Sequence, residues 1–117
     1  MENCRASIRK EIDDEGDENE TVTVNFELVQ NERQVFSCMF TKIDLENISK
    51  LLKKCESGKN CRIHFESMNG GLSVYNDNGI LSFVLSHAGN GYYSMTFCVF
   101  LNNDIISALR QCESDLS

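Results

Sequence analysis

The sequence predicts an α+β domain with the element order ββαββββα, in which two helices pack on one face of an antiparallel sheet. Three observations support this fold class. Alternating apolar and polar residues mark strands, an apolar stripe at helical spacing marks a helix, and three Asn-Gly pairs divide the second half of the chain into short strands. The chain has 117 residues, which is the length of one ordinary domain.

The first two predicted strands form a hairpin. Residues 21–29 (TVTVNFELV) alternate apolar and polar side chains, as in a strand with one buried face. The short polar stretch at residues 30–33 then predicts a turn. The return strand, about residues 34–40 (QVFSCMF), carries apolar side chains on both faces, which favours a central position in a sheet.

A helix is expected after the hairpin. Thr41 and Asp44 have the spacing of a capping box, with Asp in place of the usual Glu. The apolar residues that follow recur at helical spacing: Leu45, Ile48, Leu51, Leu52 and Cys55. Ser57-Gly58 then ends the helix.

The second half of the chain predicts a four-stranded antiparallel meander over residues 61–101. Its turns are expected at the Asn-Gly pairs 69–70, 78–79 and 90–91, because type I′ turns need positive φ at both central residues. The strands are expected near residues 61–67, 71–77, 80–87 and 92–101. A second helix begins near Asn102-Asn103-Asp104, where an asparagine can cap it.

The register at the first meander turn follows from its length. A two-residue loop at 69–70 places Phe65 opposite Val74, which keeps apolar side chains on one face. The same loop places Arg62 opposite Asp77, which is a favourable cross-strand pair.

The two later turns are expected to differ in length. A two-residue loop at 78–79 places Val74 opposite Phe83. At the third turn, a three-residue loop over 89–91 keeps the apolar face together, with Phe83 opposite Phe97. We therefore expect a bulged third turn.

The formal charge of −7 arises from 18 acidic and 11 basic residues, and it is unevenly distributed. Residues 1–20 hold eight acids and three bases, so they carry most of the negative charge. This pattern predicts an acidic, flexible N-terminal segment over residues 1–20 and a single α+β domain over residues 21–117. The alternative is an acidic arm that meets a basic partner.

The composition also narrows the class of protein. A negative net charge argues against direct nucleic-acid binding, which usually needs a basic surface. No apolar run approaches the roughly 20 residues of a membrane span. The first 20 residues lack the apolar segment of a signal peptide, so we expect a cytoplasmic protein that does not bind a membrane.

The six cysteines have no CxxC spacing and no second pair that would complete a zinc site. We therefore expect reduced thiols that pack as small apolar side chains, and no bound metal.

Catalytic groups are sparse in this sequence. His64 lies in a strand and is expected beside Tyr75, whereas His87 and the adjacent Ser86 point to opposite faces of a strand. The glycines around residue 90 lie inside a hairpin and lack the strand-to-helix context of a phosphate-binding loop. We therefore expect neither an enzyme nor a cofactor.

The meander of residues 70–101 (GGLSVYNDNGILSFVLSHAGNGYYSMTFCVFL), with its closing helix NNDIISALRQC, resembles bacterial immunity proteins of contact-dependent or polymorphic toxin systems. The resemblance covers about residues 21–113. It implies a cytoplasmic protein that binds and neutralises a cognate toxin domain, often a nuclease with a basic cleft. We expect the protein itself to be a monomer or homodimer. An acidic surface would complement such a cleft and speed association.

The candidate binding residues are acidic and tyrosine side chains of the meander and of the first hairpin: Glu27, Glu32, Glu66, Tyr75, Asp77 and Tyr92. One alternative is a phage-type inhibitor of a host defence nuclease. A second is a domain that binds a small ligand near His64, Tyr75 and His87, and a third is a small hydrolase or nuclease that uses His87.

Overall fold

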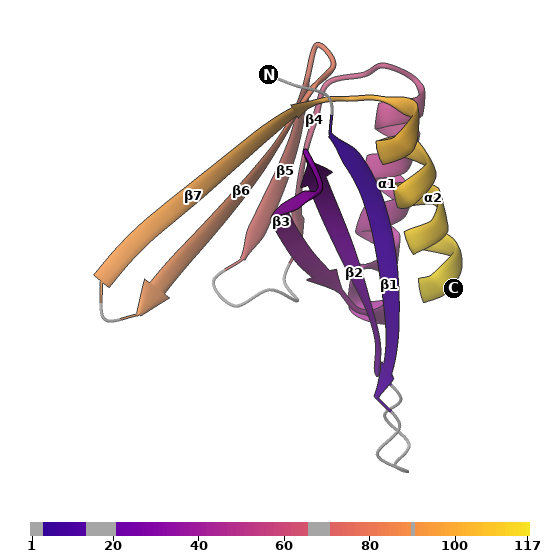
Figure 1. Cartoon of the computed structure of the whole chain (residues 1–117), viewed down its shortest axis with the longest axis horizontal. Coiled ribbons are helices and arrows are strands. Elements are labelled where there is room, and N and C mark those ends of the chain that lie inside the picture. Colours follow the sequence, from indigo (N-terminus) through magenta and orange to yellow (C-terminus); the bar gives the residue numbers. More distant parts are fainter. Residues whose placement is uncertain (1–3, 14–20, 66–70, 90) are drawn as a thin grey trace.

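The computed structural model describes residues 4–13, 21–65, 71–89 and 91–117. Its elements are β1 (Arg5–Asp13), β2 (Thr21–Gln30), β3 (Arg33–Phe40), the short 3-10 helix η1 (Lys42–Asp44), α1 (Leu45–Glu56), β4 (Cys61–Phe65), β5 (Leu72–Asp77), β6 (Ile80–Gly89), β7 (Gly91–Phe100) and α2 (Asn103–Leu116) (Figure 1). The α+β class is confirmed, and from β2 onward the order is the predicted ββαββββα.

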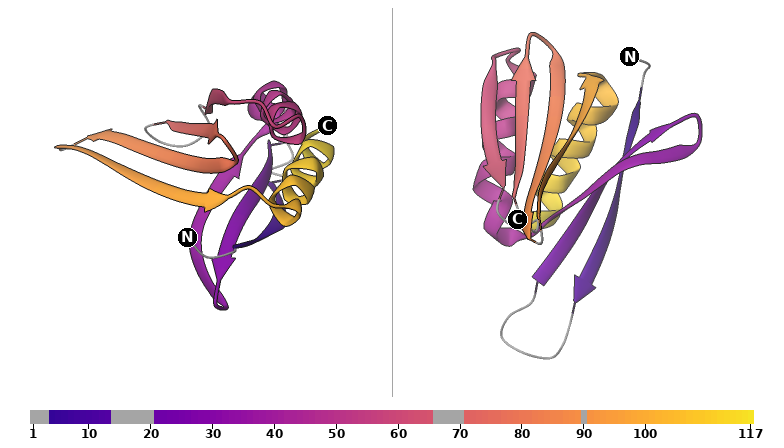
Figure 2. Two further views of the ribbon diagram at one scale, coloured as in Figure 1. Left: turned by 90° about the horizontal axis from the view of Figure 1, so that it is seen from above. Right: turned by 90° about the vertical axis from the view of Figure 1, so that its left-hand side faces the viewer.

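The strands form two antiparallel sheets, which we call sheet A (β1-β2-β3) and sheet B (β4-β5-β6-β7). Their inner faces meet through aromatic rings: the centroid of Phe83 lies 5.8 Å from that of Phe26 and 5.3 Å from that of Phe36. Seen from above, both sheets extend away from the two helices, which lie together at one side of the molecule (Figure 2, left). The core therefore lies between two sheets and a helix pair.

Within the segment 1–20 that was expected to be flexible, strand β1 corrects the expectation for residues 5–13; residues 1–3 and 14–20 lie outside the described residues. It pairs with β2 along its whole length, from Arg5 opposite Val29 to Asp13 opposite Thr21. Ala6 packs against the core on its inner side, whereas Arg9 is exposed. A strand needs apolar residues at alternate positions only. Here charged residues fill the outer side and Lys10 interrupts the inner row, so the sequence pattern conceals the strand.

Strand β3 is an edge strand, which corrects the expected central position; the central strand of sheet A is β2. The apolar side chains on the outer face of β3 are not buried, since Val35 is 39% and Met39 is 46% exposed. The pairing also contains a bulge: Leu28 faces Phe36 and Val29 faces Gln34, which leaves Val35 as an extra residue.

The first hairpin turn and the last two meander registers are confirmed. Asn31 and Glu32 both have positive φ (52° and 64°), as a type I′ turn between β2 and β3 requires. Val74 faces Phe83 across the second meander turn, and Phe83 faces Phe97 across the third. Residue 90, in the expected bulge, lies outside the described residues.

The register expected at the first meander turn is wrong by two residues. Phe65 faces Leu72, and Arg62 faces Tyr75 rather than Asp77. A two-residue shift leaves every side chain on the same face, so alternation cannot detect it. The turn itself, residues 66–70, lies outside the described residues.

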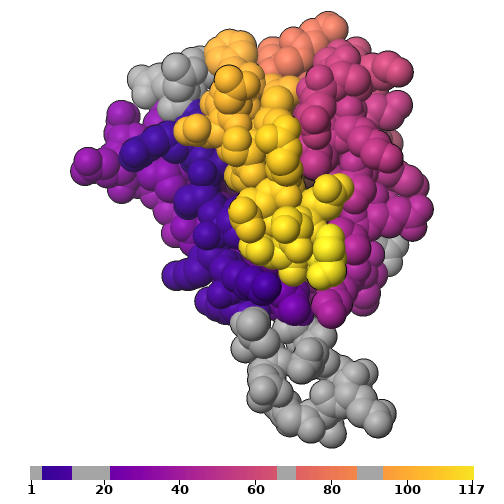
Figure 3. Space-filling model, turned by 90° about the vertical axis from the view of Figure 1, so that its right-hand side faces the viewer, coloured from indigo at the N-terminus to yellow at the C-terminus, as the bar shows by residue number. Residues whose placement is uncertain are grey.

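The helices fill the space beside the two sheets. Helix α2 packs against β1, β2 and α1, and Figure 3 shows it between β1 and α1; α1 in turn packs against β4 and β5. Both predicted helix starts are confirmed: Thr41 N–H donates to the Asp44 carboxylate at 3.1 Å, and the Asn102 side chain accepts from Ile105 N–H at 2.9 Å. The Asn102 amide also donates to the Cys4 carbonyl at 3.0 Å, which ties the N-terminal strand to α2.

Candidate functional site

The outer face of sheet B is turned away from both helices. Figure 2, right, shows the four strands in front of α1 and α2. We call the following side chains the outer face: Arg62, His64, Ser73, Tyr75, Asp77, Ile80, Ser82, Val84, Ser86, Ser94, Thr96, Cys98 and Phe100. Among these residues only Arg62 and Asp77 carry a formal charge, and most of the others are small or bear a hydroxyl group.

Contacts between neighbouring strands order this face. The Arg62 guanidinium lies 5.4 Å from the centroid of the Tyr75 ring, a cation–π contact on a half-buried tyrosine. Ser82 Oγ lies 3.3 Å from Cys98 Sγ on the strand beside it. The side chains are therefore partly preorganised by the sheet and by one another.

His64 forms the most chemically suggestive contact on the outer face. Its Nδ1 lies 3.2 Å from Ser73 Oγ, so an imidazole and a hydroxyl group are hydrogen-bonded there. The ring also packs over Gly71, where an added Cβ would come within 2.7 Å of His64 Cε1. His64 lies opposite Ser73 and not beside Tyr75 as expected, because the expected register was two residues off.

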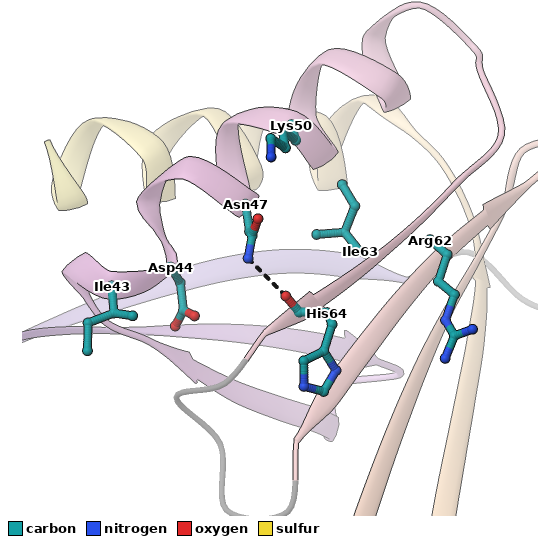
Figure 4. Close-up of a pocket in the computed structure, with 7 residues that line it drawn as sticks. All are labelled: Ile43, Asp44, Asn47, Lys50, Arg62, Ile63 and His64. Atoms are coloured by element: carbon teal, nitrogen blue, oxygen red, sulfur yellow. Dashed lines mark hydrogen bonds between the residues drawn. The ribbon is translucent and has the colours of Figure 1, made fainter.

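A shallow cavity of about 460 Å³ opens between α1 and β4, lined by Ile43, Asp44, Asn47, Lys50, Arg62, Ile63 and His64 (Figure 4). Its polar groups are bonded within the chain. Asn47 donates to the His64 carbonyl at 3.0 Å, Asp44 accepts from Thr41 N–H, and Lys50 pairs with Glu46 at 3.4 Å. The cavity offers positive charge beside an exposed Ile43, but its polar atoms do not converge on one point.

Burial controls the chemistry of three thiols. Burial raises the pKa of Cys55 to about 12, with the neighbouring Cys61 adding to the rise. Burial likewise raises the pKa of Cys112 to about 12, with Asp115 adding to it, and it raises the pKa of Cys38 well above its usual value. These thiols stay protonated and pack as apolar groups.

All six cysteines are free, and Cys98 is exposed on the outer face. Within the described ranges, no group of three or more His, Cys, Asp or Glu side chains could hold a metal ion. No helix in the described part of the chain is long and apolar enough to cross a membrane.

The candidate binding residues do not gather at one place. Tyr75 and Asp77 share the outer face of sheet B. Glu27 lies on the outer side of sheet A, which points away from sheet B, and it pairs with Arg9 at 3.6 Å. Glu32 occupies the β2–β3 turn.

Two other candidates fall outside what the structure describes. Glu66 lies in the segment 66–70, and only the backbone of Tyr92 is described, opposite Ala88. The same holds for His87, which faces Tyr93 along the backbone. The contacts that Arg62 and Ser73 make across β4 and β5 were not predicted, because they depend on the correct register of these strands.

A family model matches residues 33–109, and its description is Family of unknown function (DUF5766). The chain belongs to this family. The part that matches DUF5766 runs from β3 into α2 and contains the whole of sheet B, whereas β1 and β2 precede it. Comparisons of this DUF5766 chain with the curated proteins and with the solved structures gave no match.

Proposed function

We propose that this DUF5766 protein is a protein-binding inhibitor that docks its partner on the outer face of sheet B. The observation that carries the proposal is a sheet face turned away from the helices and poor in charge, with Tyr75 and Phe100 among hydroxyl-bearing side chains. The cores of protein interfaces are depleted of charged residues and enriched in aromatic residues and arginine.

The stiffness of the outer face favours binding. Its side chains stand on four hydrogen-bonded strands, and the Arg62–Tyr75 contact holds two of the larger ones in place. A partner that docks on preordered side chains loses less conformational entropy than one that must order a loop. Tyr75 and Arg62 are residue types that often dominate binding energy, so we assign them the central contact.

The distribution of charge favours a basic partner. All 11 basic residues, but only 11 of the 18 acidic ones, lie in the described ranges. The seven surplus acids, which could steer a basic partner, are Glu66 and six residues within 1–3 and 14–20, all outside the described ranges. A toxin domain with a basic cleft, such as a nuclease, fits this surplus of acidic residues, and we propose a cytoplasmic immunity function.

An inhibitor of a host defence nuclease would use the same electrostatics and the same face. The two functions differ in their target and not in their mode of binding. Identification of the target therefore decides between them.

The test begins with the protein as bait in a lysate of its native host, followed by identification of captured proteins. A captured candidate is then expressed alone, where an immunity partner should arrest growth, and together with the DUF5766 protein, which should restore it. We expect Tyr75→Ala and Asp77→Lys to weaken binding of the purified candidate by at least about tenfold.

The matched control is Glu46→Lys, a charge reversal on the exposed side of α1, where the side chain is 82% exposed. It should bind and protect as the wild type does. Equal binding by wild type, Tyr75→Ala and Asp77→Lys would overturn the assignment of the outer face. A captured protein that is harmless when expressed alone would overturn the immunity function.

A further inference from the structure

The edge strands of the two sheets differ in how they resist pairing with other chains. Natural proteins protect exposed edges with charged residues, bulges or short strands. Among the described residues, β1 carries charges such as Arg9 and Lys10, and β3 has the bulge at Val35. β4 is only five residues long and contains Arg62.

Strand β7 has none of these protections. It is 10 residues long, and its sequence GYYSMTFCVF contains no charged residue and no proline. Its pairing with β6 runs from Gly91 to Phe100 without a bulge. No strand in the described part of the chain pairs with its other side, because β7 is the last strand of sheet B.

The first half of β7 is also accessible. β6 and β7 extend as a two-stranded ribbon beyond the other strands (Figure 1). Ser94 and Thr96 are exposed on the outer face of this ribbon, and Met95 is 50% exposed on its inner face. A long, uncharged and accessible edge therefore presents unpaired backbone groups together with apolar surface.

We propose that β7 pairs antiparallel with β7 of a second copy, so that two sheets B join into one eight-stranded sheet. Because such pairing is two-fold symmetric, the inner faces of the two sheets B lie on one side of the joined sheet and their outer faces lie on the other. Met95 and Phe97 then lie against apolar side chains of the copy, and the hydroxyl-bearing Ser94 and Thr96 stay together on the outer face. No like charges meet across the contact.

A second copy of the chain suits the β7 edge better than an unrelated peptide does. Peptides that add a strand to a sheet are selected by side-chain pockets beside the edge. The cavity described above lies at α1 and β4, on the opposite edge of sheet B. The short, charged β4 cannot repeat the contact, so association stops at a dimer and does not continue into a fibre.

The dimer goes beyond the proposed function, because it does not require a partner. It would place two outer faces side by side in one continuous surface. Its test uses the purified full-length chain alone, so its failure would leave the partner-binding experiment unaffected.

The experiment measures molar mass by sedimentation equilibrium over a wide concentration range. We expect the wild type to be a dimer and Thr96→Lys to raise the dissociation constant at least about tenfold, because lysine at an edge opposes strand pairing. Ser94→Lys is the second variant and should act in the same direction. Circular dichroism of each variant shows whether it is folded.

Two lysine substitutions serve as matched controls. Val35→Lys alters the edge strand β3 of sheet A, and Ser107→Lys alters an exposed position on α2. Both should dimerise as the wild type does. Within residues 91–100, amide exchange of the N–H groups that point away from β6 should be slow in these dimers and fast in Thr96→Lys. A monomeric wild type at every concentration, or dimers that survive both β7 substitutions, would overturn the proposal.

Discussion

At the scale of single residues, Gly71 has a conformation and a neighbour that exclude a side chain. Its φ is +90°, in the region that L-residues avoid, and an added Cβ would meet His64 Cε1 at 2.7 Å. Gly58 has a similar φ of +66° but nothing within 4 Å of an added Cβ. A comparison of the two glycines therefore separates two losses of stability on substitution. One comes from the positive φ of the backbone, and the other comes from the clash with His64.

We expect Gly58→Ala to lower the free energy of unfolding by roughly 1 kcal/mol, from its backbone conformation. Gly71→Ala should cost roughly 1 kcal/mol more, because His64 must turn away and lose its hydrogen bond to Ser73. Urea unfolding measures both values. In a His64→Ala background the extra cost of Gly71→Ala should vanish, and a cost that persisted would show that His64 is not its cause.

The buried thiols predict how stability depends on pH. In the folded state Cys55 and Cys112 hold their protons up to a pKa of about 12, whereas unfolded thiols release them near the ordinary value of 9.0. Their contribution to stability is therefore complete below about pH 9 and is lost as the pH rises toward 12. Each thiol should contribute a slope of about 1.4 kcal/mol per pH unit in that window.

Urea unfolding at about pH 8 and about pH 10.5 tests this dependence. Cys112→Ala should reduce the loss of stability between the two pH values, because one titrating thiol is removed. Leu109→Val, a core truncation on the same helix without a thiol, should retain the pH dependence of the wild type. Identical slopes in all three proteins would contradict the role of the buried thiols.

At the scale of elements, Asn102 joins two parts of the fold. Its side-chain oxygen caps α2 and its amide group holds the carbonyl of Cys4, just before β1. Asn102→Ala should lower the free energy of unfolding by roughly 2 kcal/mol, because both bonds are lost.

Asn102→Asp separates the two roles, since it keeps an acceptor for Ile105 N–H and removes the donor to Cys4. We expect a loss of only about 1 kcal/mol, with the amide of Ile105 still protected from hydrogen exchange. Equal losses for Asn102→Ala and Asn102→Asp would mean that the cap adds nothing to stability.

The elements also differ in how well the sequence predicts them. The turn at Asn78-Gly79 and the caps at Asp44 and Asn102 follow from local sterics and short-range hydrogen bonds. The strand Arg5–Asp13 was missed, because charged residues fill its outer side and Lys10 interrupts the apolar row on its inner side. The contact between Arg62 and Tyr75 was missed because side-chain alternation tolerates a two-residue shift.

At the scale of the whole molecule, β1 makes residues 5–13 part of the domain. It pairs with β2 over nine residues and packs against α2. Removal of residues 1–13 should expose the far edge of β2 and uncover α2. We expect the midpoint of thermal unfolding to fall by more than about 10 °C, or cooperative unfolding to be lost.

Removal of residues 1–3 is the matched control and keeps every residue of β1. Its unfolding midpoint should stay close to that of the full chain, as differential scanning calorimetry would show. A truncation at residue 13 that unfolds like the full chain would contradict the structural role of β1.

The sequence alone determines the α+β class, most of the helices and strands, and two of the three meander registers. These features depend on interactions between residues close together in the chain, such as Thr41 with Asp44 or Val74 with Phe83. Only the tertiary structure decides that the strands form two sheets, that β3 lies at an edge of sheet A, and that β7 is the last strand of sheet B. Those outcomes depend on which apolar faces meet across the core, and pairing between distant segments leaves no local pattern in the sequence.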